Sequence, residues 1–438
     1  MEIFLNKIFK KKSLSNLIWL GSDKFLRSGI LFILTIFVAQ YLGPEQFGIL
    51  NYILSIIAIF YVFSSLGLEP IIVKKIVENK KNSNLILSTS LVIRLLGSFC
   101  CYLILFVILK LINFDEKLLN YTLIIGLTII LKTTEVFFSY FHAKLLSKMI
   151  IISQFIGLFF LVFFQIILLI TKSPLIYFFL SYLFEVLVIS ILITVIYFKK
   201  NNMLNFLKFK FKTAKQLLIK SWPILFSGIG IILYMRIDQI MLGSMINQKS
   251  VGIYSVAVRI SEIWHFIPKI ILISITPYLI QLYKKKIKKF EFEMIKFIKL
   301  NIFISILISL FVFLFSKTIV ITLFGADYIE SVQVINIYIW TTVLVSIGVI
   351  SSQWYIVSNT QKYNFIYIFL GAIVNIILNY YLIPIYGPNG AAIATILTYS
   401  FVTIFFDLLS SKTRDLFKIK MMIVKKVVKG IEGLLQEK

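Results

Sequence analysis

The sequence predicts an all-α polytopic membrane protein with about twelve transmembrane helices in two six-helix bundles. Three observations lead to this fold class. Of the 438 residues, 59% are hydrophobic, and the mean hydropathy of the chain is +0.95. Apolar runs of about 20 residues follow one another, each long enough to cross a hydrocarbon layer of about 30 Å as a helix. Finally, the basic residues gather in every second break between these runs.

The apolar runs are expected to be helices, because only a helix or a closed barrel satisfies its backbone polar groups in lipid. A barrel is excluded, since the runs lack the period-two alternation of barrel strands. The predicted spans cover residues 15–41, 47–73, 85–110, 118–140, 150–171, 174–198, 221–244, 251–280, 296–316, 331–357, 362–384 and 390–410. No break between them is long enough for a soluble domain.

The breaks mark the ends of each predicted span, because they alternate between short outer turns and basic inner segments. In the first half these are the corner LGPEQFG (42–48), the basic segment 74–81, FDEK (114–117), the basic segment 144–148 and the turn at Lys172. In the second half they are the corner LGSMINQKSVG (242–252), the basic segment 284–299, the glycine turn 323–335, the short segment at Lys362 and the glycine turn 386–399.

The net charge of +26 is distributed by side of the membrane. With the N-terminus inside, inner segments hold 33 of the 45 Lys and Arg residues and outer segments hold five. This asymmetry follows the positive-inside rule and predicts that both termini are cytoplasmic. It also removes the need for a nucleic-acid partner. The clusters at 283–289 and 421–430 are expected to contact anionic membrane lipids.

Six spans precede the basic segment 199–220 and six follow it. The predicted domains are an N-terminal bundle at 1–198, a cytoplasmic linker at 199–220, a C-terminal bundle at 221–411 and a basic cytoplasmic tail at 412–438. Equal sidedness of the halves predicts two parallel repeats related by an axis along the membrane normal.

The same corner marks both halves. LGPEQFGILNY ends the first span and LGSMINQKSVGIY ends the seventh. In each, a Leu-Gly pair is followed by a second glycine and then a tyrosine: Gly43, Gly48 and Tyr52, then Gly243, Gly252 and Tyr254. Glycine permits a tight turn and a close approach of helices at such a corner.

Charged residues lie within the predicted spans, where each costs about 2.5–3.5 kcal/mol if it faces lipid. The basic ones are Lys24, Arg27, Arg94, Lys132, Arg236, Arg259 and Lys269. The acidic ones are Asp23, Glu69, Glu135, Glu185, Asp238 and Glu262. Together they would cost on the order of 30 kcal/mol in lipid, which exceeds the stability of a protein, so most must face water or one another.

Spacing offers two interpretations of these charges. Asp23 and Arg27 share a helix face, and polar stripes follow the fourth span (Lys132, Glu135, Ser139, His142) and the eighth (Arg259, Glu262, His265, Lys269). In one interpretation, pairs such as Lys132–Glu135 are ion pairs that hold the helices. In the other, the basic residues bind an anionic substrate, because the guanidinium fork fits phosphate oxygens. Four carboxylates are candidates for binding a coupling proton or sodium ion: Asp23, Glu135, Asp238 and Glu262.

Four segments together resemble the oligosaccharide flippases of bacterial surface-polysaccharide assembly, a family in the superfamily that also holds multidrug extruders and the lipid II flippase. They are VAQYLGPEQFGILNY, RIDQIMLGSMINQKSVGIYSVAVRI, LFGADYIESVQVI and IPIYGPNGAAIAT. The resemblance implies two six-helix bundles around a cationic central cavity and transport by alternating access. The implied substrate is an isoprenoid-diphosphate-linked oligosaccharide that moves from the inner to the outer leaflet of the bacterial cytoplasmic membrane, for O-antigen or capsule assembly.

Other classes are weighed on the same residues. A cation-coupled multidrug exporter of the same superfamily is the first alternative, although the basic midplane would repel cationic drugs. A membrane glycosyltransferase or polysaccharide polymerase is the second, and the short outer breaks lack its catalytic loop. No catalytic residue, metal site or cofactor is expected, since the only cysteines are the adjacent Cys100 and Cys101 and there are two histidines. The expected partners are the lipid-linked oligosaccharide, membrane lipids and the polysaccharide polymerase machinery.

Overall fold

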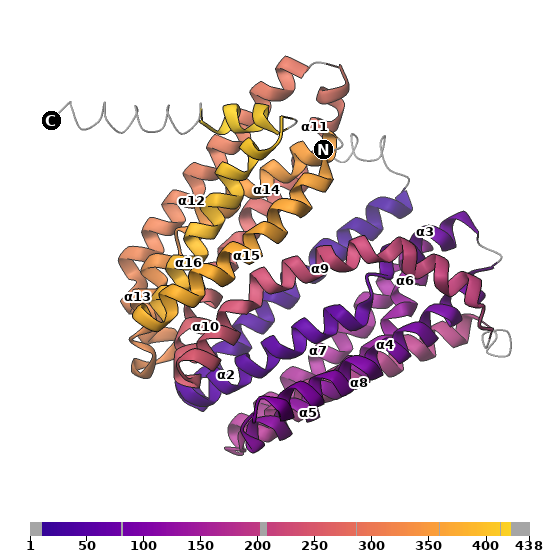
Figure 1. Cartoon of the computed structure of the whole chain (residues 1–438), viewed down its shortest axis with the longest axis horizontal. Coiled ribbons are helices and arrows are strands. Elements are labelled where there is room, and N and C mark those ends of the chain that lie inside the picture. The colour runs from indigo at the N-terminus through magenta and orange to yellow at the C-terminus, as the bar shows by residue number, and fades with distance from the viewer. Residues whose placement is uncertain are drawn as a thin grey trace. The chain divides into compact units, whose positions relative to one another are not determined.

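The structure is a computed structural model that describes residues 11–79, 82–201, 208–285, 287–358, 360–411 and 413–421. Every regular element in these ranges is a helix (Figure 1). Ten helical stretches in this described part are long and apolar enough to cross a membrane. The chain is therefore a multi-pass membrane protein.

The chain divides into two units. Unit 1 contains the residues up to Leu42 and Ile49–Ile232. It contains α2 (Lys11–Ser65) except for the segment Gly43–Gly48, and the first part of α9 (Phe211–Met245). Between them come α3 (Glu69–Glu78), α4 (Ser83–Leu111), α5 (Glu116–Leu131), the 3₁₀ turn η2 (Lys132–Glu135), α6 (Val136–Ala143), α7 (Ser147–Ile170) and α8 (Leu175–Lys200).

The core of unit 1 joins helices that lie far apart in the sequence. Ile72 of α3, Phe137 of α6, Tyr197 of α8 and Leu217 of α9 are all buried in one apolar cluster. The rings of Phe137 and Tyr197 stack with their centroids 4.5 Å apart. Because Leu217 packs here, α9 begins at Phe211, ahead of the predicted start of the seventh span at 221.

Unit 2 contains Gly43–Gly48 and the chain from Leu233 onward. Its helices are the second part of α9, α10 (Gln248–Glu262), the 3₁₀ turn η4 (Ile263–His265), α11 (Phe266–Lys285), α12 (Ile287–Phe324), the 3₁₀ turn η5 (Ala326–Tyr328), α13 (Ser331–Tyr338), α14 (Thr341–Val357), α15 (Gln361–Tyr386), α16 (Pro388–Ser400), the π-helical turn η6 (Phe401–Phe405) and the 3₁₀ turn η7 (Phe406–Leu409).

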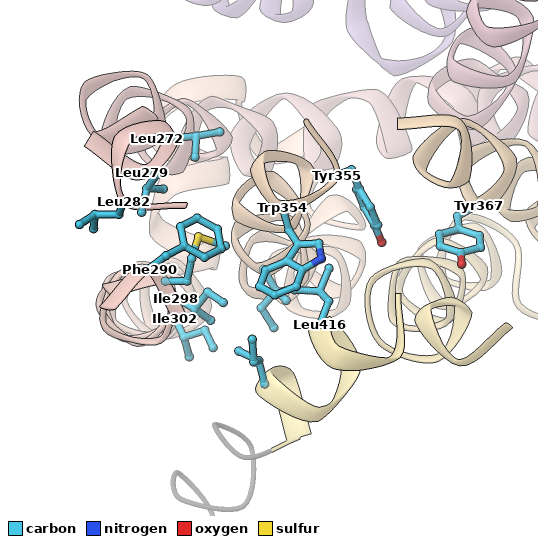
Figure 2. Packing of buried hydrophobic residues seen from close by; sticks show 13 residues of the cluster. Leu272, Leu279, Leu282, Phe290, Ile298, Ile302, Trp354, Tyr355, Tyr367 and Leu416 are labelled. Atoms are coloured by element: carbon cyan, nitrogen blue, oxygen red, sulfur yellow. The ribbon is translucent and has the colours of Figure 1, made fainter. Parts of the chain in front are cut away.

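The core of unit 2 includes the segment that follows the last span. Figure 2 shows Phe290 of α12 and Trp354 of α14 beside Leu416, and Ile419 belongs to the same cluster. Residues 414–421 are helical, with Leu416 and Ile419 buried and Arg414 exposed. The first part of the predicted basic tail is therefore an amphipathic helix packed on unit 2.

The two corners meet inside unit 2. The backbone of Gly43 is non-helical, with φ +68°, so α2 turns there. A Cβ atom on Gly48 would lie 1.7 Å from the carbonyl oxygen of Gln248, and one on Gly252 would lie 1.9 Å from that of Pro44. The contact is reciprocal: a glycine of each corner lies against a backbone carbonyl of the other corner. Backbone touches backbone at both points, which explains why glycine stands there.

The expected count of twelve spans is approximate. The first two are continuous in the stretch Leu26–Glu78, which bends at the Gly43 corner. The eighth, predicted at 251–280, is divided by the 3₁₀ turn η4 into α10 and α11. Arg259 and Glu262 precede this turn and His265 is its last residue.

Candidate functional site: buried charges in each unit

The predicted basic residues of unit 1 lie beside acidic partners from other helices. Arg27 of α2 donates a hydrogen bond from Nη2 to Oε1 of Glu185 on α8, at 2.6 Å. The Glu185 side chain is 8% exposed. A charge-assisted bond of this length holds α2 against α8 in a region of low dielectric constant. The side chains of Asp23 and Lys24 lie outside the described part, so the predicted Asp23–Arg27 pairing stays a prediction.

A second network surrounds Glu135, where the fourth span is broken by a 3₁₀ turn. Nη2 of Arg94 lies 3.6 Å from Oε2 of Glu135, and the hydroxyl of Tyr61 donates to the same oxygen. Nζ of Lys132 lies 4.4 Å from the centroid of the Tyr61 ring, a cation–π distance. The structure thus pairs Glu135 with Arg94 on α4. The predicted stripe on the fourth span is divided among several partners instead of forming a Lys132–Glu135 pair.

The network of unit 1 extends to a histidine. Nε2 of His142 lies 3.7 Å from Oε1 of Glu69. Both carboxylates, Glu69 and Glu135, therefore have a basic group from another element beside them. The site mixes both signs of charge, as the sequence predicts, and Arg94 is its most buried cation, with its side chain 6% exposed. Among the described residues, the buried Arg94 Nε atom has no hydrogen-bond partner.

Unit 2 holds a carboxylate that is buried among neutral groups. Asp238 of α9 is 4% exposed. It accepts hydrogen bonds from the hydroxyl of Tyr254 at 2.5 Å, from Nδ2 of Asn379 at 2.5 Å and from the hydroxyl of Thr395 at 2.7 Å. Asn379 Nδ2 also donates to Oδ1 of Asn375, at 3.1 Å. These groups come from α9, α10, α15 and α16, so four helices converge on one carboxylate.

This cluster has the composition of a site for a small cation. Oxygen atoms of a carboxylate, amides and a hydroxyl are ligands that hard cations prefer, and a proton on Asp238 would remove the same buried charge. Within the described residues, no group of three or more His, Cys, Asp or Glu side chains could hold a metal ion, and Cys100 and Cys101 are free thiols. The three groups that contact Asp238 all donate to it and stabilise its carboxylate, and its predicted role in binding a coupling proton or sodium ion stays a prediction.

Arg236 and Arg259 form the basic part of unit 2. Both are partly buried, and they repel each other, while Glu262 attracts Arg236. Nη1 of Arg236 donates to Oε1 of Gln239 at 3.4 Å. The side chain of Lys269 lies outside the described part. Arg236 and Arg259 carry like charge, and the role predicted for them in binding an anionic substrate stays a prediction.

Sequence reasoning missed one buried pair. Nζ of Lys420 lies 2.7 Å from Oδ2 of Asp407, with side chains 3% and 0% exposed, and also donates to the Thr403 carbonyl at 2.6 Å. The hydroxyl of Tyr355 donates to the other carboxylate oxygen. Burial lowers the pKa of the Lys420 ammonium, and the Asp407 carboxylate opposes that shift. The signal in the sequence is the spacing of Thr413, Leu416 and Lys420, which marks one face of a helix.

Comparisons with known proteins agree with the geometry. A family model described as polysaccharide biosynthesis protein matches residues 13–283, and the MatE model matches residues 223–381. No curated protein matches the chain.

Several solved structures share the fold. An inward-facing multidrug resistance MATE family transporter of the MOP superfamily is 14% identical, with 91% of this chain and 95% of that chain covered and a TM-score of 0.71. The inward closed lipid II flippase MurJ is 15% identical, with coverages of 94% and 92% and a TM-score of 0.74. A MOP superfamily transporter from Pyrococcus furiosus is 13% identical, with coverages of 93% and 95% and a TM-score of 0.60. At these identities the likeness shows the fold, and it confirms the predicted all-α, MATE-like class.

Proposed function

The chain belongs to the polysaccharide biosynthesis protein family of membrane transporters, and from this premise we propose that it is a flippase for isoprenoid-diphosphate-linked oligosaccharide repeat units. The units would move from the inner to the outer leaflet of a bacterial cytoplasmic membrane, by alternating access, to supply surface polysaccharide such as O-antigen or capsule. The solved lipid II flippase MurJ shares the fold and by its name flips lipid II. The relatives are transporters, so no catalytic residue is assigned.

The observation that carries this proposal is the set of arginines that are buried or partly buried in each unit. Arg94 has a free donor and a side chain that is 6% exposed, and Arg236 and Arg259 repel each other. A diphosphate offers oxygens that accept bidentate hydrogen bonds from guanidinium groups. The negative substrate would relieve the repulsion between the arginines, and it would gain more in this low dielectric than in water. The predicted substrate residues Lys24, Lys132 and Lys269 stay candidates for the same role.

The proposal is tested in cells that lack the gene and are then complemented with it. Lipid-linked saccharides are extracted, and the leaflet in which completed units reside is determined with an impermeant reagent. We expect completed units to accumulate on the inner side while surface polysaccharide disappears, and the intact gene to reverse both. Incomplete or unpolymerised units on the outer side would instead identify a glycosyltransferase or polymerase.

A multidrug exporter is the second candidate, and the match of the MatE model to residues 223–381 favours it. In this candidate function, Asp238 would bind the coupling cation. The two candidates differ in the charge of the cargo, because a cationic drug would be repelled by Arg236 and Arg259. Normal surface polysaccharide together with raised drug sensitivity in the deletion strain would select the exporter.

Neutralising the arginines is expected to impair transport. Arg27→Gln and Arg236→Gln each remove one charge-assisted donor, worth about 1.5–3 kcal/mol, so the rate of saccharide flipping should fall about tenfold to a hundredfold. Lys74→Gln is the matched control, because the Lys74 side chain is 70% exposed and pairs with Glu78 on the surface of unit 1. Flipping is measured in proteoliposomes with a fluorescent lipid-linked saccharide, and membrane insertion by extraction and size-exclusion chromatography. Full activity of both arginine variants would contradict the assignment.

We further propose that Asp238 binds the coupling ion, either a proton or sodium. Asp238→Asn should abolish the dependence of transport on an ion gradient, because an amide keeps the size and shape of the side chain and removes the charge. Transport driven by gradients of pH and of sodium is measured separately for both proteins. Asn375→Ala serves as the comparison that removes a neighbouring amide and keeps the carboxylate. An Asp238→Asn variant with unchanged ion dependence would move the coupling role to Glu135 or Glu262.

The charge distribution supports a proposed orientation in the bacterial cytoplasmic membrane with both termini in the cytoplasm. The predicted domain ranges 1–198, 199–220, 221–411 and 412–438 stay predictions. Membrane lipids are expected to contact the apolar side chains exposed on the helices, such as Leu111, Ile170 and Leu314. The polysaccharide polymerase machinery is the proposed acceptor of the translocated units.

A further inference from the structure

Unit 2 contains a pocket that lies apart from the buried charges. Its volume is about 250 Å³. Ile253 of α10, Ile329, Val334 of α13 and Pro388 of α16 form its apolar walls. The helices α10, α13 and α16 pack together at one end of unit 2 (Figure 1). That end carries the turns which the sequence predicts to face outward.

The pocket is built by turns that fix its walls. Gly325 and Gly387 have φ +93° and +56°, so the chain reverses immediately before η5 and α16. The hydroxyl of Ser331 donates to the carbonyl of Ile253 at 2.9 Å, which holds α13 against α10. Nζ of Lys249 lies 2.6 Å from Oε1 of Glu330. The pocket therefore exists before any ligand arrives, which lowers the ordering cost of binding.

Its polar side is a pair of amides with unused hydrogen-bonding capacity. Nδ2 of Asn389 donates to Oε1 of Gln333 at 3.1 Å. The Oδ1 atom of Asn389 is buried and has no hydrogen-bond partner among the described residues. The other atom of the Gln333 amide is a donor. If both amides are turned over, the contact is kept and the roles exchange, so one donor and one acceptor remain in either assignment.

We propose that this pocket binds one ring of a neutral saccharide, an inference that rests on the proposed function. A sugar hydroxyl both donates and accepts, and so it matches the free donor and acceptor of Gln333 and Asn389. The apolar walls suit the C–H faces of the ring. The one carboxylate, Glu330, is neutralised by Lys249, so the pocket carries no net charge to select an ionic ligand. Its volume lies below the range of about 300–1,000 Å³ typical of drug-sized ligands.

The position of the pocket gives it a defined role. It lies at the predicted outer turns, where the saccharide of a translocated unit emerges. Binding a ring there would hold the product on the outer side after the diphosphate has left the arginines. The pocket would thus recognise the sugar, while the buried charges recognise the diphosphate.

The test uses the full-length protein in lipid nanodiscs and saturation-transfer NMR. The probes are glucose, galactose, N-acetylglucosamine and glucuronate, each at millimolar concentration. At least one neutral sugar is expected to receive saturation from the wild-type protein. The Gln333→Leu/Asn389→Leu variant should bind that sugar at least tenfold more weakly. Asn120→Leu is the control, since Asn120 is an exposed amide on α5 of unit 1.

A second variant protects the test against misfolding. Ile329→Trp fills the pocket from a wall residue that is 43% exposed, so it leaves the amides and the core untouched and should also abolish binding. Absence of any sugar signal in the wild-type protein, equal binding by all variants, or a preference for glucuronate would overturn the inference.

The outcome is distinguishable from that of the proposed function. A wild-type protein that restores flipping in the deletion strain and binds no free sugar would refute the pocket and leave the flippase standing. If the protein binds sugar through Gln333 and Asn389 but the deletion strain accumulates no lipid-linked units on the inner side, the flippase proposal is refuted and the sugar pocket stands.

Discussion

Replacing Asp407 by alanine is expected to lower the free energy of unfolding by about 3–5 kcal/mol. The substitution leaves the ammonium of Lys420 buried, with its side chain 3% exposed and only the Thr403 carbonyl as an acceptor. It also removes the acceptor of the Tyr355 hydroxyl. Without the carboxylate, burial acts unopposed and lowers the pKa of Lys420 further. The packing of Leu416 and Ile419 on unit 2 should weaken as a consequence.

The effect is measured by reversible unfolding in mixed micelles, with the fluorescence of Trp354 reporting on the core that Figure 2 shows. Asp415→Ala is the matched control, because Asp415 pairs with Lys418 in the same segment at 3.2 Å and both side chains are about 70% exposed. An exposed pair of this kind contributes about 0–1 kcal/mol. Equal losses in the two variants would show that burial does not govern the pair.

A double variant separates the two partners. In Asp407→Ala/Lys420→Met no buried charge remains and no side chain is enlarged, so most of the stability lost in Asp407→Ala should return. The remaining deficit reflects the unpaired Tyr355 hydroxyl, about 1–3 kcal/mol. A double variant as unstable as Asp407→Ala would mean that the shape of the site, and not its charge, is what matters.

Gly252→Ala is expected to destabilise unit 2 by about 3 kcal/mol, near the upper end of the usual overpacking costs. The added Cβ would lie 1.9 Å from the carbonyl oxygen of Pro44, and a backbone atom cannot rotate away as a side chain can. Gly48→Ala should have a similar effect, since its Cβ would lie 1.7 Å from the carbonyl of Gln248.

The same unfolding assay applies to the corner glycines. Gly29→Ala is the control, because Gly29 lies within α2 and a Cβ there meets no atom within 4 Å. In a helix that substitution should be neutral or stabilising by up to about 1 kcal/mol. If the Gly48 and Gly252 variants were as stable as the control, the two corners could separate readily. That result would contradict the tight packing between them.

The sequence was sufficient for the class of fold and for the recurrence of the corner. Both depend on local patterns: apolar runs of membrane length, basic inner segments and glycine at matching places. That the two corners touch through Gly48 and Gly252 could not be predicted, because a repeat shows that two segments are alike and not that they pack on each other.

The sequence could not predict which residues pair with the charged residues of the spans. Helical spacing places Lys132 near Glu135, yet the structure pairs Glu135 with Arg94. It also adds Glu185 of α8 as a partner of Arg27, which spacing within one helix cannot show. Periodicity tells which residues share a face, while the helix opposite that face is set by tertiary packing. In the fourth span the 3₁₀ turn η2 also changes the spacing itself, from the 3.6 residues of an α-helix to about three per turn.

The same reasoning explains the two results in unit 2. Asn375 and Asn379 lie four residues apart and so share a helix face, but only the structure shows that Asn379 donates to Asp238 as well as to Asn375. Lys420 was missed because it lies beyond the last span, where a lysine is expected to be solvated.

The division of α9 between the units has a consequence for the order of synthesis. Unit 1 includes residues up to Ile232, and Leu217 completes its core, so a nascent chain that stops at residue 198 cannot finish this unit. Unit 2 has the opposite dependence, because Gly43–Gly48 is made long before the rest of it. At about 5–20 residues per second, Gly48 waits about 10–40 s for Gly252 to emerge. The first corner is thus already synthesised when the rest of unit 2 packs against it.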